Sequence, residues 1–247
     1  MEPLYLQIKP VSIFRTRHLM KKLLVLLVLL FSIGVYAQKG KDTEPRNESF
    51  ITTDVISPFY YQGTLKGFSD NGTPRWRLGY IKNINPKTKI GIDIGYGNAN
   101  SSIIQTFDNY SLWEIRPEYY HILNPKRKTL SYFSLALFYL NQHEEFKNQY
   151  FFSKDNGYST FDKADYKRQK FGLIPKFGMF VNISNRIGLN WYTGVGVNYR
   201  INSYSDFVNL RPKQYNEEHF SPYFRREGNR IGVEFTIGLK IYYRIKN

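Results

Sequence analysis

Residues 231–245 read IGVEFTIGLKIYYRI, a segment in which two kinds of side chain alternate. Every second residue is bulky and apolar or aromatic: Ile231, Val233, Phe235, Ile237, Leu239, Ile241, Tyr243 and Ile245. The residues between them are Gly232, Glu234, Thr236, Gly238, Lys240, Tyr242 and Arg244. Because successive side chains of a strand point to opposite faces, this alternation predicts a β-strand, and a long one beside the usual length of about 5–6 residues. An apolar face opposite a polar one predicts a strand of a transmembrane β-barrel, with lipid outside and a polar lumen inside.

The N-terminal part of the chain has the pattern of an export signal. Lys21-Lys22 precedes an almost wholly apolar run at residues 23–35, and Ala37 occupies the last position before a cleavage site. A transmembrane anchor is the alternative, but this run is shorter than the roughly 20 residues that a spanning helix needs. We therefore predict a signal peptide at residues 1–37 with the true start at Met20, a flexible N-terminal segment at 38–49, and a barrel at 50–247.

Composition limits the chemistry and the partners of the exported chain. It has no Cys, which excludes disulfides, thiolate catalysis and Cys–zinc sites. Its net charge is +15, and removal of residues 1–37 takes away five basic residues and one acidic residue, which leaves +11. An anionic partner is expected, and export favours outer-membrane lipid and lipopolysaccharide over nucleic acid. Aromatic residues make up 17% of the chain, which suits a membrane interface.

Alternation and turn signals predict eight strands, at residues 50–61, 75–83, 89–98, 110–122, 130–142, 170–183, 187–203 and 231–245. Short, Asn-containing turns join the second strand to the third, the fourth to the fifth and the sixth to the seventh, whereas the other connections are long. This rhythm predicts a closed, all-β, eight-stranded antiparallel up-and-down transmembrane β-barrel with short periplasmic turns and long extracellular loops. Pro58, Pro117 and Pro175 lie inside predicted strands and require bulges there, or strands that start later.

Aromatic residues on the apolar parity sort into two levels. Trp76 and Trp113 are expected near the outer rim. A second group is expected near the periplasmic rim: Tyr119, Phe133, Trp191 and Tyr243. These six residues form the predicted membrane-interface girdle, because amphipathic aromatic rings collect at both edges of a transmembrane barrel.

The opposite parity carries glycines and charges. The charged members form the predicted lumen charge network: Arg77, Asp93, Glu114, Arg116, Glu118, Lys176, Arg200, Glu234, Lys240 and Arg244. Buried charges need partners, and eight strands leave an interior just wide enough for side chains. A paired network that plugs the lumen is therefore expected, with an ion-selective pore as the alternative.

No residue pattern points to catalysis, to a cofactor or to a metal. His143, beside Glu144 and Glu145, is the nearest approach to the His, Ser and carboxylate set of lipid-modifying barrels, and we expect it to be a solvated rim histidine. No pair of histidines has metal-ligand spacing, and no phosphate-binding glycine loop is present. We expect no catalytic residues, no cofactor and no metal.

Two predicted extracellular loops, about residues 144–169 and 204–228, interleave basic and aromatic side chains. Interleaving of this kind can bind nucleic acid by stacking, but export makes that partner unsuitable. Two roles remain open. The loops either pack on one another and on lipopolysaccharide phosphates, or bind a specific surface glycan or protein.

Four segments carry a resemblance to known proteins: Val35-Tyr36-Ala37-Gln38, Arg75-Trp76-Arg77-Leu78-Gly79-Tyr80, Gly91-Ile92-Asp93-Ile94-Gly95-Tyr96 and Gly238-Leu239-Lys240-Ile241-Tyr242-Tyr243-Arg244. The chain resembles small outer-membrane β-barrel proteins of the OmpA-barrel and OmpX type, and more narrowly uncharacterised outer-membrane barrels of Bacteroidota. The resemblance implies an outer-membrane location, insertion by the barrel-assembly machinery and no catalytic residues. We expect a monomer with a structural, adhesion or surface-binding role. A lipid-modifying enzyme and a narrow pore for small solutes are the alternatives.

Overall fold

The computed structural model describes residues 48–59, 73–103, 106, 108–155, 157–212 and 226–246. The predicted signal peptide, residues 38–47, the end of the first predicted strand and residues 213–225 lie outside this part of the chain. The elements are β1 (Glu48–Asp54), the 3-10 helix η1 (Ser57–Phe59), β2 (Trp76–Asn85), β3 (Thr88–Asn98), β4 (Asp108–Ile122), β5 (Leu130–Ser153), β6 (Gly157–Asn182), β7 (Ile187–Val208), β8 (Arg211–Pro212) and β9 (Gly228–Lys246). Within the described residues, no helix has the length and apolar character needed to cross a membrane.

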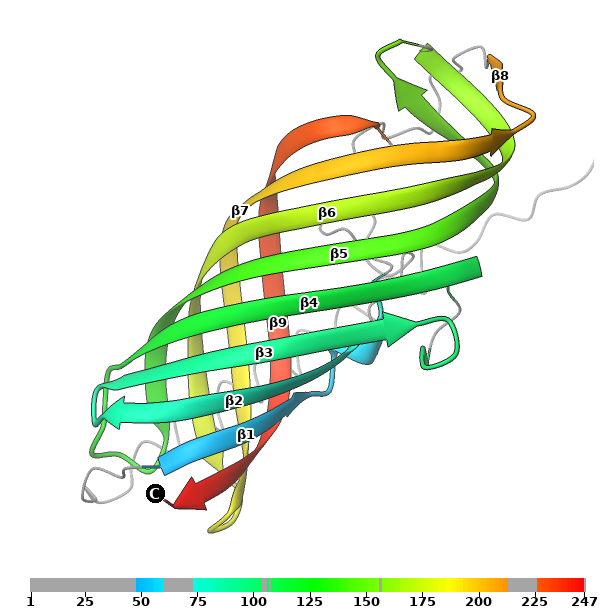
Figure 1. The fold of residues 1–247 in the computed structure, drawn as a ribbon. Helices are drawn as coiled ribbons and strands as arrows, with labels where there is room; N and C mark the ends of the chain where they lie inside the picture. Colours follow the sequence, from blue (N-terminus) through cyan, green and yellow to red (C-terminus); the bar gives the residue numbers. More distant parts are fainter. Residues whose placement is uncertain are drawn as a thin grey trace, which may run out of the picture. The chain divides into compact units, whose positions relative to one another are not determined.

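Eight of the strands form a closed antiparallel ring. Hydrogen bonding follows the order β5-β4-β3-β2-β1-β9-β7-β6, and pairing of β5 with β6 closes the ring (Figure 1). Strands that follow one another in the ring along the chain are paired, the first strand β1 pairs with the last strand β9, and β8 only adds a short ladder to β6. The prediction of eight antiparallel strands in up-and-down order is thereby confirmed.

The two faces of the ring differ in burial. Along β4 every second residue from Tyr110 to Ile122 is buried, and the residues between them are exposed. Buried side chains of different strands meet inside the ring, as Arg77 of β2 and Tyr192 of β7 do. The alternation read from the sequence therefore separates an inner face from an outer face.

Two strands extend well beyond their predicted ends. Pairing of β5 with β6 continues in one register from Leu130 opposite Phe180 to Ser153 opposite Gly157. The segment predicted as a long loop at residues 144–169 is therefore a β-hairpin in which β5 ends at Ser153 and β6 begins at Gly157, and that prediction is wrong. Neighbouring β7 runs on to Val208 and pairs with this hairpin. We call residues 143–168 and 201–212 together the hairpin extension.

The three prolines resolve in two different ways. Pro58 lies in η1, because β1 ends at Asp54, before the proline, so the predicted strand is too long at its end and neither a bulge nor a later start is involved. Pro117 and Pro175 remain inside β4 and β6 without a bulge. Pairing of β4 with β5 stops at Ile115 opposite Tyr139 and resumes in the same register at Glu118 opposite Ala136. The missing proline N–H thus interrupts the ladder locally, and the bulges expected at these two positions are absent.

The ring has two different ends. Short turns join β2 to β3, β4 to β5 and β6 to β7 at one end, which we call the short-turn end. The hairpin extension and the connection of β3 to β4 lie at the other end, which we call the hairpin end (Figure 1). Glu48 of β1 pairs with Lys246 of β9, so the described chain begins and stops at the short-turn end.

Candidate functional site

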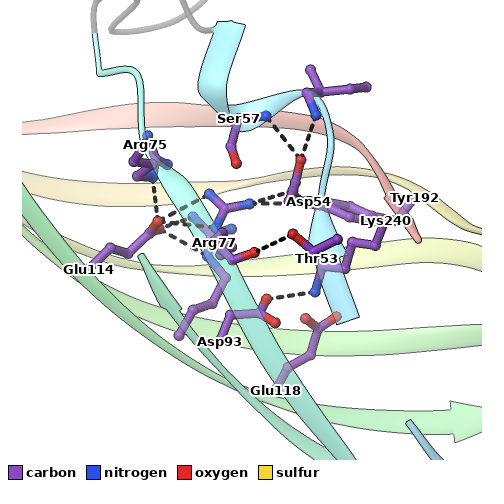
Figure 2. A network of polar contacts seen from close by, with 12 residues as sticks. Thr53, Asp54, Ser57, Arg75, Arg77, Asp93, Glu114, Glu118, Tyr192 and Lys240 are labelled. Atoms are coloured by element: carbon purple, nitrogen blue, oxygen red, sulfur yellow. Dashed lines mark hydrogen bonds and ion pairs between the residues drawn. The ribbon is translucent and has the colours of Figure 1, made fainter. Parts of the chain in front are cut away.

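The interior of the ring holds a dense ionic network centred on Arg77 of β2 (Figure 2). Its guanidinium pairs with Asp54 of β1 at 2.7 Å and with Glu114 of β4 at 3.0 Å. Glu114 also forms ion pairs with Arg75 and Arg116, so one carboxylate is paired with three guanidinium groups. All five side chains are almost fully buried, where an unpaired charge would be costly. The contacts therefore compensate the charges within the ring.

Further pairs cross the interior between strands that are not neighbours. Lys240 of β9 pairs with Asp93 of β3 at 2.6 Å, and Lys176 of β6 pairs with Glu118 of β4 at 2.7 Å. Both ammonium groups lie close to the ring of Tyr192: its centroid is 4.6 Å from Nζ of Lys176 and 5.5 Å from Nζ of Lys240. Ammonium groups at these distances are attracted by the face of the aromatic ring. Side chains thus span the interior at this level.

Seven members of the predicted lumen charge network pair within this central region: Arg77, Asp93, Glu114, Arg116, Glu118, Lys176 and Lys240. Glu234 lies nearer the hairpin end and pairs with Lys170 at 2.9 Å. Arg244 lies at the short-turn end and pairs with Glu48 at 2.9 Å. Arg200 is buried on β7, between Lys170 of β6 and Arg230 of β9 in the register of the sheet.

Several partners in this network were not predicted from the sequence: Glu48, Asp54, Arg75, Lys170 and Tyr192. Glu48 and Asp54 lie on β1, where the apolar alternation is weak. Lys170 shares the parity of Lys176 on β6, and the same counting rule would have found it. Arg75 lies inside the predicted strand 75–83 at the parity of Arg77, so the same rule would also have found it, although β2 itself begins at Trp76.

Aromatic side chains fill the interior at the short-turn end. The cluster consists of Phe50, Ile81, Tyr120, Ile122, Tyr132, Phe180 and Tyr242. Phe50 lies 5.0 Å from Phe180 and 4.8 Å from Tyr242, measured between ring centroids. Glycine makes room for such rings, since a Cβ at Gly188 would come within 2.3 Å of the Tyr242 ring. Gly188 therefore leaves the space that the Tyr242 ring occupies.

The members of the predicted membrane-interface girdle lie on the outer face. Trp76 and Trp113 occupy one row near the hairpin end, joined through Tyr96 in the register of β2, β3 and β4. The other four lie towards the short-turn end: Tyr119, Phe133, Trp191 and Tyr243. All are exposed except Trp191, which is half-buried. Phe177, missing from the prediction, lies between Phe133 and Trp191 with centroid distances of 5.5 and 6.2 Å.

His143 lies at the base of the hairpin extension on the outer face. The register of β4 and β5 sets it opposite Ser111, a neighbour that its sequence position does not reveal. Its Nδ1 atom is buried without a hydrogen bond, and Glu144 points inward, where it accepts a hydrogen bond from Gln142. The structure thus brings a serine to His143 but turns the adjacent carboxylate away.

A second aromatic cluster holds the hairpin extension together. It comprises Phe146, Phe151, Phe161, Ala164, Tyr166 and Tyr204 from β5, β6 and β7. Around it, Glu145 pairs with Lys163 at 2.8 Å, and Lys147 pairs with Asp108 at 2.6 Å. The hydrogen bond from Lys163 lowers the pKa of Glu145, and the hydrogen bond to Asp108 raises the pKa of Lys147. The extension is therefore a structured sheet with its own core.

Charge is distributed unevenly between the two ends. Residues 144–169 contain five basic and five acidic residues, and residues 204–228 contain four of each, so neither segment has a net charge. Exposed cations gather instead at the short-turn end: Lys82, Lys87, Lys126, Arg127, Lys128 and Arg186. The sequence has no acidic residue from 79 to 92, from 119 to 143 or from 166 to 205. The unbalanced positive charge of the surface therefore lies opposite the hairpin extension.

No protein-family model matches the chain, and none of the curated proteins matches it. Within the described residues, no three His, Asp or Glu side chains are grouped closely enough to hold a metal ion. The features of the described residues that bear on function are therefore the two faces and the two ends of the ring.

Proposed function

We propose that this chain is an outer-membrane β-barrel protein with a structural, adhesion or surface-binding role and a plugged lumen. The outer face of the ring carries the proposal. On β3 every outward residue from Ile90 to Tyr96 is a large exposed hydrophobic residue: Ile90, Ile92, Ile94 and Tyr96. Apolar outward positions continue on β2, β4, β5, β6, β7 and β9, whereas the inner face carries the ionic network as well as the aromatic cluster at the short-turn end. A protein dissolved in water has the opposite arrangement, and lipid makes this one favourable.

The filled interior supports a plug rather than a pore. Ion pairs cross the ring at the level of Lys176 and Lys240, and the aromatic cluster around Phe50 and Tyr242 occupies the short-turn end. An eight-stranded barrel has room for little beyond such side chains. Recording in planar bilayers separates the two cases, because steady single-channel conductance would require an open path through this cluster.

The hairpin extension supports the surface-binding role. Its β-ladder and its aromatic cluster give a rigid surface at the end remote from the short turns. Since its charges balance, recognition of a surface glycan or a protein by hydrogen bonds and by the half-buried rings of Phe152, Tyr158 and Phe207 fits it better than general attraction to lipopolysaccharide phosphates. Under this proposal lipid and lipopolysaccharide surround the ring, and the barrel-assembly machinery inserts it as a monomer.

Cell fractionation combined with heat-modifiable gel mobility tests the proposal. We expect the native protein in the outer-membrane fraction, with a faster-migrating folded form that converts to the full-length position on boiling. Recovery of a folded protein from the periplasmic soluble fraction would instead indicate a soluble barrel and would overturn the proposal.

A lipid-modifying enzyme is the second candidate function, and the pairing of Ser111 with His143 on the outer face favours it. A serine next to a histidine is the beginning of a nucleophile and base pair, but no hydrogen bond joins them in the described structure. Ser111→Ala and His143→Ala test this candidate by mass spectrometry of the extracted lipid A and phospholipids. A modified lipid that is present with the wild-type protein and absent with either variant would establish the enzyme. Identical lipid profiles would exclude this pair.

A further inference from the structure

The outer face of the ring contains a groove that the proposed function does not use. It has a volume of about 590 Å³ and crosses five strands, from Tyr80 on β2 to Leu173 on β6. This volume lies within the range of about 300–1,000 Å³ that is common for ligand pockets. Its walls are almost wholly apolar, so its occupant on an outer face must itself be apolar over most of its length.

A proline produces the hollow. In the register of the sheet Tyr80 lies opposite Ile92, Ile92 lies opposite Pro117, and Leu137 lies opposite Leu173. Pro117 is the one compact side chain in this row, and both its neighbours on the outer face of β4 are large. The floor of the groove is therefore built by Pro117, while long side chains of the flanking strands form its walls.

One edge of the groove differs in chemistry from the rest. The next row towards the short-turn end contains Lys82, Ile90 and Tyr119 in register. Lys82 is exposed and, among the described residues, is the only charged side chain that lines the groove from the outer face, since Glu118 points inward to Lys176. A cation at one edge of an apolar groove complements a ligand with an apolar chain and an anionic head.

We propose that this groove binds an anionic glycerophospholipid, with an acyl chain over Pro117 and the phosphate at Lys82. The inference rests on the proposed membrane location and adds a specific lipid site to it. The cations of the adjacent turns, Lys87, Lys126, Arg127 and Lys128, lie beyond Lys82 and Tyr119 along the same strands. Basic residues beside a membrane surface attract anionic lipid, so these turns hold the headgroup end of the site at an anionic leaflet.

Native mass spectrometry of the full-length protein, released from detergent micelles, tests the site. Dioleoyl phosphatidylglycerol and dioleoyl phosphatidylcholine are added separately, and the lipid retained on the folded protein is measured. Lys82→Gln removes the headgroup contact, and Lys154→Gln is its control because that exposed cation lies in the hairpin extension, away from the groove and the short turns. Pro117→Leu fills the groove, and Pro175→Leu is its control because that outer-face proline lies outside it.

We expect the wild-type protein to retain phosphatidylglycerol in preference to phosphatidylcholine. Lys82→Gln should reduce that preference about fivefold, the usual effect of one basic residue at an anionic surface. Pro117→Leu should reduce retention of both lipids, whereas the two controls should match the wild type. The site is overturned if the wild type shows no preference, or if either variant behaves like its control.

Flotation with phosphatidylglycerol vesicles distinguishes failure of the proposed membrane location from failure of the lipid site. A chain that does not enter them defeats the membrane proposal together with the site, whereas a chain that inserts without these lipid effects defeats the site alone.

Discussion

Lys240 and Asp93 form an ion pair of 2.6 Å across the interior of the ring, although β1 and β2 lie between their strands in the sheet. Neither side chain is more than about one-twentieth exposed. Their contact is therefore tertiary and independent of the hydrogen-bond ladder. It ties the strand nearest the C-terminus to the third strand of the chain.

Removing one member of this pair should be strongly destabilising. Asp93→Asn leaves the ammonium of Lys240 buried without its carboxylate, which typically costs about 3–5 kcal/mol. We expect Asp93→Asn to unfold at a lower urea concentration than the wild type. The midpoint of unfolding is measured from the gel mobility of the folded form. The double variant Asp93→Leu with Lys240→Met should recover most of the loss, because it removes both charges. Equal stability of Asp93→Asn and the wild type would show that water already reaches the pair.

The close approach of Gly238 and Tyr192 gives a packing prediction. A Cβ at Gly238 would lie 2.2 Å from Cζ of Tyr192, whose hydroxyl donates a hydrogen bond to Asp54 at 2.9 Å. Gly238→Ala should displace the tyrosine and cost about 1–3 kcal/mol, the usual effect of overpacking. In the background of Tyr192→Leu the same alanine should cost much less. Additive losses in the double variant would contradict a direct clash.

The order and pairing of the strands followed from the sequence because alternation and turn spacing are local signals. The parity that sets Asp93 and Lys240 on the inner face is visible in residues 89–98 and 231–245. The ion pair between Asp93 and Lys240 cannot be predicted in this way, because it depends on which strands face each other across the closed ring. The same holds for Ser111 and His143, which are 32 positions apart and become neighbours only through the register of β4 and β5.

The side-chain pattern of the hairpin extension explains why the sequence predicts a loop there. From residue 143 to the end of β5, and along the part of β6 that pairs with it, both faces of the strands are polar or aromatic. This part of the sheet lies beyond the band of exposed apolar side chains on the outer face of the ring. Phe146 and Phe151 are buried in a local cluster, and strict apolar alternation is no longer required there. The first predicted strand errs in the other direction: it continues through Pro58, whereas β1 ends at Asp54 and Pro58 lies in η1.

Charge on the outer face separates a membrane protein from a soluble one. Ile94 is 61% exposed and lies opposite Ile115, between the row of Trp113 and the row of Tyr119. Ile94→Arg should cost about 2–4 kcal/mol in a bilayer, because the guanidinium must leave water. The same change should have little effect on a surface residue of a soluble protein. Unfolding in phosphatidylcholine vesicles measures the difference, with Ile94→Leu as the control. An unchanged midpoint for Ile94→Arg would argue against lipid at this face.

The pH dependence of the hairpin extension follows from Glu145. The Lys163 hydrogen bond lowers the pKa of this carboxyl in the folded protein below its ordinary value of about 4.3. The contribution to stability is then complete above the ordinary pKa and is lost as the pH falls through the lower folded value. Hydrogen exchange of residues 143–168, measured between pH 7 and pH 3, should show loss of protection only in the acidic part of this range. Glu145→Gln should lose part of that protection already at neutral pH and should flatten its dependence on pH. The central strands serve as the internal reference, and a parallel change in them would indicate unfolding of the whole ring rather than loss of the Glu145 contacts.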